Sequence, residues 1–248
     1  MEQENQGQSV ARNYGISIAK GEYVTFLDPD DFVIEKYVPQ ILENLDLYAD
    51  IDLYQYNAYI FKDNKVVDTL RLAENNDCTV LDLNIFKNIL NKKIWFSWLR
   101  IVRRDLIDEN FFPKGVNFQD MMAFPQLYKK VNKIKNIEES LVFYRVYEES
   151  SVNGFQPTEK MILSADYGMH LYERSTNVTD IMVYKQFIDL SLDYHLRKYG
   201  IKTTQYWLVK NIFLKKESIY YLKFLNFIKL SFKLYSICVY RYLKDLFK

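Results

Sequence analysis

The sequence contains few of the residues that build disulfide scaffolds or metal clusters. Its 248 residues include two cysteines, Cys78 and Cys238, which are far apart, and two histidines. This scarcity excludes a disulfide-rich domain and a cysteine-rich zinc site, and it favours a reducing compartment. His170 and His195 stand alone without metal-ligand spacing, so both are interpreted as structural.

An excess of charge of one sign is also absent. Lys and Arg number 33 against 32 Asp and Glu, a formal net charge of +1. The chain has no overall attraction to polyanions and no nucleic-acid fold motif, so we expect no nucleic-acid partner. No apolar run approaches the roughly 20 residues that span a bilayer, and the polar start does not resemble a secretory signal. These absences predict a cytoplasmic protein.

Apolar residues make up 49% of the chain, enough to build a core. Strand and helix patterns alternate through the first 150 residues, and helical periodicity dominates beyond residue 156. The predicted helices are 9–20, 39–48, 83–90 and 121–131, and the predicted strands are 22–28, 51–61, 66–67 and 141–147. Residues 94–102 form a mixed apolar stretch of undecided type. The composition shift near Gly154 and Pro157 predicts an α/β domain over 1–153 and a helical region over 154–248.

An acidic cluster follows the first predicted strand. Asp28-Pro29-Asp30-Asp31 comes directly after Glu22–Asp28, and the carboxyl ends of strands are where open α/β sheets bind ligands. Side chains at i and i+2 share a face of an extended chain, so Asp28 and Asp30 are expected to converge. Convergent carboxylates suit Mg²⁺ or Mn²⁺. The alternative is a turn in which Asp30 or Asp31 caps the next helix.

The surroundings of this cluster resemble a known family. Residues 7–16 read GQSVARNYGI, residues 19–24 read AKGEYV, and residues 26–31 read FLDPDD. Together they are similar to the GxSxARNxGI helix, AxGxY link and FLDxDD strand end of family 2 glycosyltransferases with the GT-A fold. Residues 98–107, WLRIVRRDLI, and residues 141–151, LVFYRVYEESS, are similar to two later stretches of that family. The resemblance covers roughly residues 5–153.

The resemblance implies a nucleotide-diphosphate sugar as donor. Asp28 and Asp30 match the family's DxD pair, of which the second is typically a metal ligand and the first lies near the ribose or sugar. Asp31 is a further donor-side candidate that is equally able to cap a helix. Arg12 matches the arginine of the ARN helix near the donor site, and its alternative is a packing or surface role.

The same resemblance implies a catalytic base. Asp120 matches the Asp of the family's Glu-Asp pair, the general base of inverting members, and its alternative is an N-cap of a helix that starts at Met121. Gln119 stands where the family usually has Glu; the lost negative charge is expected to affect acceptor binding or the basicity of Asp120. Trp98 is an acceptor-site candidate, although a lone Trp is more often part of the core.

The chain departs from the family at its start. The family begins with a strand, a helix and a second strand that bind the nucleobase and ribose, and the first family residues here are Asn5-Gln6-Gly7. We therefore expect a truncated GT-A domain whose 22–28 strand lacks its neighbours. Either Met1 is not the true start, or the chain is the remnant of a disrupted gene. The 248-residue chain alone is expected to have little or no transferase activity.

The end of the chain is basic and apolar. Residues 209–248 contain nine basic and two acidic residues. On a helical wheel one arc of about 140° collects the polar positions, which are Lys223, Asn226, Lys229, Lys233, Ser236, Arg241, Lys244 and Lys248. This pattern suits an anionic membrane interface. The alternative is a terminal helix that packs on the domain while its basic side chains extend to water.

Taken together, the sequence predicts a truncated GT-A mixed sheet with helices on both faces, followed by a helical region. The resemblance implies an inverting, Mg²⁺- or Mn²⁺-dependent transfer of sugar to a surface-polysaccharide or lipid-linked acceptor. The enzyme would lie at the inner face of the cell membrane. The alternative is an inactive remnant that serves as a membrane-associated or interaction module.

Overall fold

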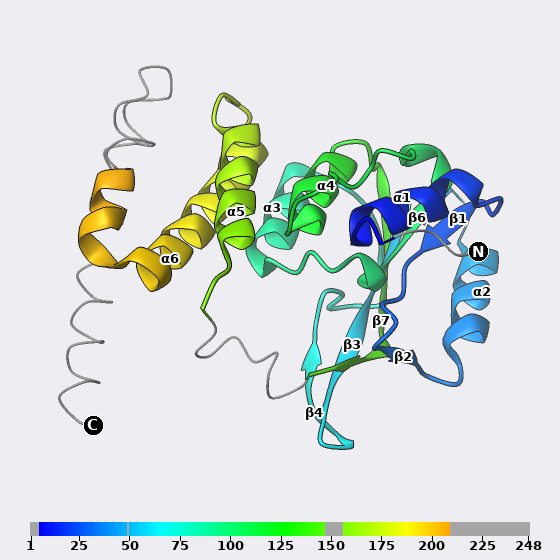
Figure 1. The fold of residues 1–248 in the computed structure, drawn as a ribbon. Helices are drawn as coiled ribbons and strands as arrows, with labels where there is room; N and C mark the ends of the chain where they lie inside the picture. The colour runs from blue at the N-terminus through cyan, green and yellow to red at the C-terminus, as the bar shows by residue number, and fades with distance from the viewer. Residues whose placement is uncertain (1–4, 49, 147–155, 209–248) are drawn as a thin grey trace. The chain divides into compact units, whose positions relative to one another are not determined.

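The computed structural model describes residues 5–48, 50–146 and 156–208 (Figure 1). The chain divides into two compact units between residues 155 and 156. The first unit is an α/β domain and the second is helical, so each is described by itself.

The described residues of the first unit form a mixed sheet and four α-helices. The helices are α1 (Gln8–Ile18), α2 (Tyr37–Leu47), α3 (Leu83–Lys92) and α4 (Gln119–Tyr128). The strands are β1 (Tyr23–Thr25), β2 (Phe32–Val33), β3 (Leu53–Lys62), β4 (Lys65–Leu70), β5 (Cys78–Val80), β6 (Arg100–Arg103) and β7 (Lys133–Arg145). Two 3₁₀ turns, η1 (Ser97–Leu99) and η2 (Arg104–Leu106), flank β6.

The sheet has the strand order β1-β6-β3-β7-β2, with β4 paired to β3 and β5 paired to β7. The pairing of β3 with β7 is parallel and the other pairings are antiparallel. Among the described strands, β1 pairs with β6 alone and therefore lies at an edge. The expected truncation of the domain before residues 22–28 stays a prediction.

The alternation of side chains along β3 places helices on both faces of the sheet. Tyr54 and Tyr56 point to one face and belong to a buried cluster, against which Tyr37 and Ile41 of α2 pack. Gln55, between them, points to the other face and accepts a hydrogen bond from the Tyr128 hydroxyl of α4 at 2.9 Å. Since consecutive strand residues face opposite sides, α2 and α4 cover opposite faces. The predicted mixed α/β architecture is confirmed.

Strand β3 and helices α2 and α3 lie close to their predicted bounds, whereas β7 begins at Lys133, eight residues before the predicted strand 141–147. Helix α2 begins at Tyr37 with Pro39 in its first turn, where the missing N–H costs nothing. Asp63 and Asn64 both have positive φ, the conformation of a tight hairpin turn, and they connect β3 to β4. The undecided stretch 94–102 contains η1 and the start of β6.

Three local predictions are wrong at the start of the chain. Ser9 does not cap α1, because the helix begins at Gln8 with Gly7 as its N-cap. The helix also ends before Ala19 rather than at Lys20. The first strand is three residues long and only half-buried, because it lies at the sheet edge and a buried strand needs neighbours on both sides.

The described residues of the second unit contain α5 (Glu159–Tyr172) and α6 (Val178–Leu208). The two helices approach closely at Gly168, where a Cβ atom would lie 2.2 Å from the Phe187 ring. His195 Nε2 lies 3.2 Å from Asp166 Oδ2, so its contacts in the structure fit the structural role expected for it. No described helix is both long enough and apolar enough to span a membrane.

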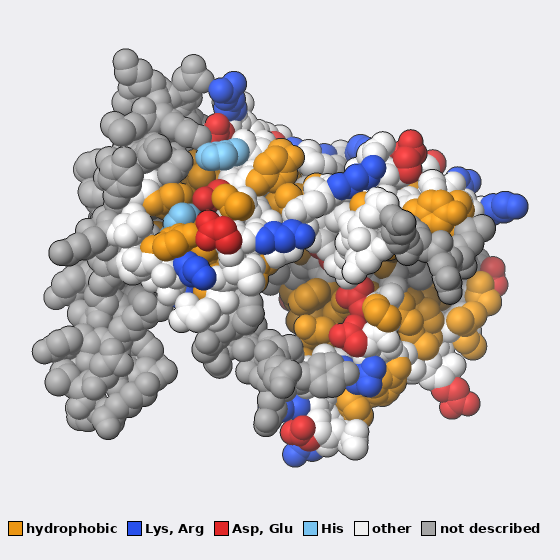
Figure 2. Space-filling view, viewed as in Figure 1, with side chains coloured by type: hydrophobic (Ala, Val, Ile, Leu, Met, Phe, Trp, Pro, Cys, Tyr) orange, Lys and Arg blue, Asp and Glu red, His pale blue; other side chains and the backbone are white. Residues whose placement is uncertain are grey.

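Apolar side chains also remain at the surface of the first unit, as Figure 2 shows in orange. The most exposed of them on α2 are Val38, Leu42 and Leu47. Single exposed apolar residues are normal in proteins of this size.

Candidate active site

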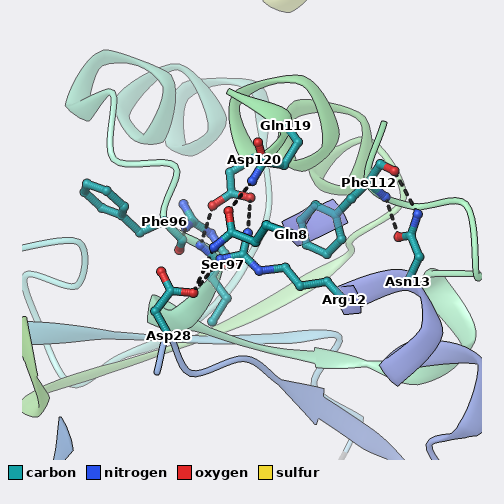
Figure 3. Close-up of polar contacts among 10 residues, drawn as sticks. Gln8, Arg12, Asn13, Asp28, Phe96, Ser97, Phe112, Gln119 and Asp120 are labelled. Atoms are coloured by element: carbon teal, nitrogen blue, oxygen red, sulfur yellow. Dashed lines mark hydrogen bonds and ion pairs between the residues drawn. The ribbon is translucent and has the colours of Figure 1, made fainter. Parts of the chain in front are cut away.

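Sheet topology brings the acidic cluster and the 94–97 segment to the same place. Strands β1 and β6 are antiparallel, with Thr25 opposite Ile101. The residues that follow β1 therefore lie beside the residues that precede β6. Helix α4 starts over this end of the sheet, and α1 passes alongside it, so that side chains from four segments meet (Figure 3).

Arg12 lies at the centre of this meeting point. Its Nη2 donates to Asp28 Oδ1 at 2.7 Å and its Nη1 donates to Asp120 Oδ1 at 2.8 Å. The Arg12 side chain is 9% exposed, whereas Asp28 and Asp120 are 24% and 17% exposed. The guanidinium carbon also lies 5.3 Å from the centroid of the Phe112 ring. One cation thus joins two carboxylates that the sequence places 92 residues apart.

Asn13, the residue after Arg12, holds helix α1 beside the polar contacts of Arg12. Asn13 is buried, and its amide donates to the Phe112 carbonyl at 2.8 Å while its carbonyl accepts from the Phe112 N–H at 2.9 Å. This paired contact fixes α1 against the segment that leads into α4. The orientation of Arg12 is therefore set by its neighbour.

Asp120 lies in the first turn of α4, where the helix dipole favours a negative charge. Phe118, in a left-handed conformation, is the N-cap, so the alternative N-cap role of Asp120 is wrong. Asp120 Oδ2 instead accepts a hydrogen bond from the Ser97 N–H at 3.1 Å. Burial raises the pKa of Asp120, while the charge of Arg12 and the Ser97 N–H act in the opposite direction.

Two glutamines close the ring of polar contacts. Gln119 donates to Gln8 Oε1 at 2.6 Å, and Gln8 Nε2 donates to Asp28 Oδ1 at 3.2 Å. Gln119 is therefore part of this ring, and the chain of contacts runs from α4 through α1 to Asp28. Gln8 was not predicted as a site residue, and only its place one residue before Ser9 in the matched helix could have suggested it.

The acidic cluster forms a turn. The Asp31 N–H donates to the Asp28 carbonyl at 3.1 Å, so the chain is not extended here and the expected reason for convergence of Asp28 and Asp30 is wrong. Asp31 is buried, and its Oδ1 accepts from the Arg145 N–H at 3.0 Å. Burial raises the pKa of Asp31 to about 6. Lys36, and neither Asp30 nor Asp31, is the N-cap of α2.

The carboxylates present can be compared with what a divalent ion needs. No group of three or more His, Cys, Asp or Glu in the described part of the chain could enclose a metal. Asp30 is exposed, and no hydrogen bond or ion pair joins its carboxylate to another described residue. One or two carboxylates suit Mg²⁺, which takes its other ligands from water and substrate phosphates. The residues therefore fit a shared site for the ion and do not fit an all-protein cage.

Trp98 is part of the core. It is 1% exposed, and its ring stacks on Phe96 and Tyr144 with centroids 5.1 and 5.2 Å apart. An acceptor has no access to a ring in this position. The geometry favours the packing role over the expected acceptor contact.

A cavity of about 540 Å³ borders the polar ring. It lies between α1 and the segment from Tyr23 to Pro29, and its lining includes Gln8, Arg12 and Asp28. The side of the ring that holds Asp28 is therefore open, whereas Asp120 is the more buried of the two carboxylates.

Removing the shared cation should reveal how much the fold depends on it. Arg12→Met leaves Asp28 and Asp120 close together without their partner, so we expect a loss of about 3 kcal/mol in the free energy of unfolding. Urea denaturation near neutral pH measures this loss. Adding Asp120→Asn to Arg12→Met should recover part of it, because one uncompensated charge disappears.

Lys20→Met is the matched control, because it removes one positive charge from an exposed position just after α1. Its effect should stay within about 0.5 kcal/mol. Equal losses in the Arg12 and Lys20 variants would show that the double ion pair carries no stability.

Comparison with known proteins gives a consistent result. Residues 1–111 match the sequence profile described as Glycosyl transferase family 2. Glycosyltransferase GlyG of Streptococcus pneumoniae is 29% identical over 157 residues, which cover 58% of this chain and 51% of the relative. Putative glycosyltransferase EpsH of Bacillus subtilis is 28% identical over 176 residues, which cover 69% of this chain and 49% of the relative.

A third relative, uncharacterized glycosyltransferase YibD of Escherichia coli, is 31% identical over 159 residues, which cover 60% of this chain and 45% of the relative. The chain thus spans about half the length of these curated relatives. The profile match and the relatives together support a family 2 glycosyltransferase domain within residues 1–111, and the mixed α/β fold is consistent with it.

Proposed function

We propose that the chain acts in the transfer of a sugar from a nucleotide-diphosphate sugar to a hydroxyl group of a surface-polysaccharide or lipid-linked acceptor. The observation that carries this proposal is the double ion pair of Arg12, at 2.7 Å to Asp28 and 2.8 Å to Asp120. It joins the carboxylate expected at the donor to the carboxylate expected to act as base. A transfer reaction needs both groups within reach of one sugar.

In this proposal Asp120 accepts the proton of the attacking acceptor hydroxyl. A hydroxyl is a poor nucleophile, and a positioned carboxylate that removes its proton contributes to the rate. Direct attack from the face opposite the leaving group inverts the anomeric carbon. Burial, which raises the pKa of Asp120, makes its carboxylate a stronger base than an exposed aspartate.

Asp28, Asp30 and Arg12 form the donor side of the proposed site. Asp30 and Asp28 would hold Mg²⁺ or Mn²⁺, which as a Lewis acid would stabilise the negative charge of the departing diphosphate. Arg12 keeps Asp28 and Asp120 at a fixed separation and lowers the repulsion between them. Asp31, through its hydrogen bond with the Arg145 N–H, holds the turn that presents Asp30.

Gln119 is proposed to lie at the acceptor side. It neighbours Asp120 and carries no charge, so it adds no repulsion to the base. Its amide contact with Gln8 gives it a fixed orientation. Trp98 is not included in this acceptor side, because its ring is buried in the core.

Binding of nucleotide separates an enzyme from an inactive interaction module. Isothermal titration of the chain with UDP, GDP and dTDP, each with and without Mn²⁺, should show metal-dependent binding of at least one of them. Asp30→Ala should abolish the metal dependence, because it removes the exposed carboxylate ligand. Glu35→Ala, at an exposed acid just after the turn, is the matched control. Absence of binding to all three nucleotides would favour the inactive module.

Asp120→Asn tests the base. With the matching donor and acceptor, we expect turnover to fall by roughly 100- to 10,000-fold, because the amide cannot accept the proton. Nucleotide binding should be retained, and Gln126→Ala, on the exposed side of α4, should leave turnover unchanged. The rate of the unaltered protein should fall as pH drops through the pKa of Asp120, which lies above that of an ordinary aspartate. A rate that is independent of Asp120 would contradict the mechanism.

We also propose that residues 209–248 bring the enzyme to the inner face of the cell membrane, where a lipid-linked acceptor lies. This segment lies outside the described residues, and the proposal rests on its nine basic and two acidic residues among many apolar ones. Basic residues near a membrane surface each contribute about 1 kcal/mol of attraction to anionic lipid.

Sedimentation with phosphatidylglycerol vesicles at low salt tests this location. We expect the chain to bind them and to lose binding when Lys229, Lys233, Arg241 and Lys244 are all replaced by Gln. The control replaces Lys20, Lys65, Lys129 and Lys185, four exposed lysines of the described residues, and it changes the net charge equally. Equal loss in both variants would mean that net charge alone directs the binding.

A further inference from the structure

Arg100 is a fully buried cation outside the ring of polar contacts described above. It is the first residue of β6 and is 0% exposed. Its Nε donates to the Tyr128 hydroxyl at 2.9 Å, its Nη1 to the Phe96 carbonyl at 2.8 Å, and its Nη2 to the Ile94 carbonyl at 2.6 Å. No carboxylate in the described part of the chain forms an ion pair with it. Burial of a charge carries a large desolvation cost, which hydrogen bonds to the charged group must offset.

The acceptors of Arg100 belong to the two segments that hold Asp120. Ile94 and Phe96 lie just before Ser97, whose N–H donates to Asp120 Oδ2 at 3.1 Å. Tyr128 lies on α4, the helix that carries Asp120, and the guanidinium carbon is also 4.6 Å from the ring centroid of Phe124 on that helix. Arg100 thus fastens the 94–97 segment to α4.

Ser97 contacts Asp120 through its backbone N–H and not through its side-chain hydroxyl. Ser97 is 0% exposed, and its Oγ has no hydrogen-bond partner among the described residues. The residue therefore acts on Asp120 through its backbone N–H alone. Because the peptide group is planar, the Phe96 carbonyl fixes the direction of the Ser97 N–H. Arg100 donates a hydrogen bond to this carbonyl.

We propose that Arg100 is a positioning residue for Asp120: it holds the Ile94 and Phe96 carbonyls against α4, so that the Ser97 N–H binds the Asp120 carboxylate. This inference rests on the proposed function for the role of Asp120 as base. The positive charge of Arg100 acts in the same direction, since it lowers the pKa of Asp120 against the effect of burial. Arg12 holds one oxygen of the carboxylate, and the segment fixed by Arg100 holds the other.

The Ser97 amide can be observed alone. Phe96-Ser97 is the one Phe-Ser pair in the sequence, so ¹³C-carbonyl phenylalanine combined with ¹⁵N-serine labels a single peptide bond. Its NMR signal, followed from about pH 4 to pH 8, should show one inflection from ionisation of Asp120. This inflection should disappear in Asp120→Asn. If it persists there, the Ser97 N–H does not bind Asp120 and the proposal is overturned.

Arg100→Lys is the main variant, because it keeps the charge but cannot reach all three acceptors. We expect the inflection to move to higher pH and hydrogen exchange of the Ser97 amide to become at least about fivefold faster. Ser97→Ala keeps the N–H, so it should leave both unchanged. An unchanged inflection and exchange rate in Arg100→Lys would overturn the proposal, as would an equal acceleration at every amide, since that reports a general loss of stability.

Tyr128→Phe serves if Arg100→Lys does not fold. It removes one acceptor of the guanidinium, and the same two readouts should change in the same directions by smaller amounts, with no change again overturning the proposal. None of these measurements needs donor, acceptor or turnover. Turnover that does not depend on Asp120 would therefore contradict its role as base. An unchanged Ser97 amide signal in Arg100→Lys would contradict the positioning role of Arg100.

Discussion

The double ion pair of Arg12 is the interaction on which the proposed site depends. Asp28 follows an edge strand, and Asp120, 92 residues further along the chain, lies in the first turn of a helix. Without a cation between them, two partly buried carboxylates would repel each other and favour more open positions. The positive charge of Arg12 offsets this repulsion. The paired hydrogen bonds of Asn13 with Phe112 hold the part of α1 that carries Arg12 in position.

Backbone groups also help to hold the site. Asp120 is fixed by Arg12 on one oxygen and by the Ser97 N–H on the other, and the segment that offers this N–H is tied to α4 through Arg100. A base whose two oxygens are both engaged keeps one orientation, which a proton transfer requires. The donor side is different, because Asp30 is exposed and its carboxylate forms no hydrogen bond or ion pair with another described residue. It can take a ligand without first breaking a contact.

Much of the fold could be predicted from local patterns. The alternation in residues 51–61 and the helical spacing in residues 39–48 and 83–90 act over short distances, and the structure confirms these elements. The start of the chain was predicted less well, because Ser9 and the 22–28 segment have the composition of a cap and a buried strand. Composition does not indicate whether a strand lies at the edge of a sheet. Strand β1 does lie at an edge among the described strands, and it is only three residues long.

The sequence by itself indicated the family, through motifs at 7–31 and 98–107, and with it the candidate residues Arg12, Asp28, Asp30 and Asp120. Only the tertiary structure decided what these residues do to one another. It showed that Arg12 bridges two carboxylates, that Gln8 links Gln119 to Asp28, and that Trp98 is buried in the core. The reason is physical: motif spacing fixes contacts only within a helix or a turn, whereas these contacts join segments about 15 to 110 residues apart. The antiparallel pairing of β1 with β6 and the docking of α1 on Phe112 bring those segments together.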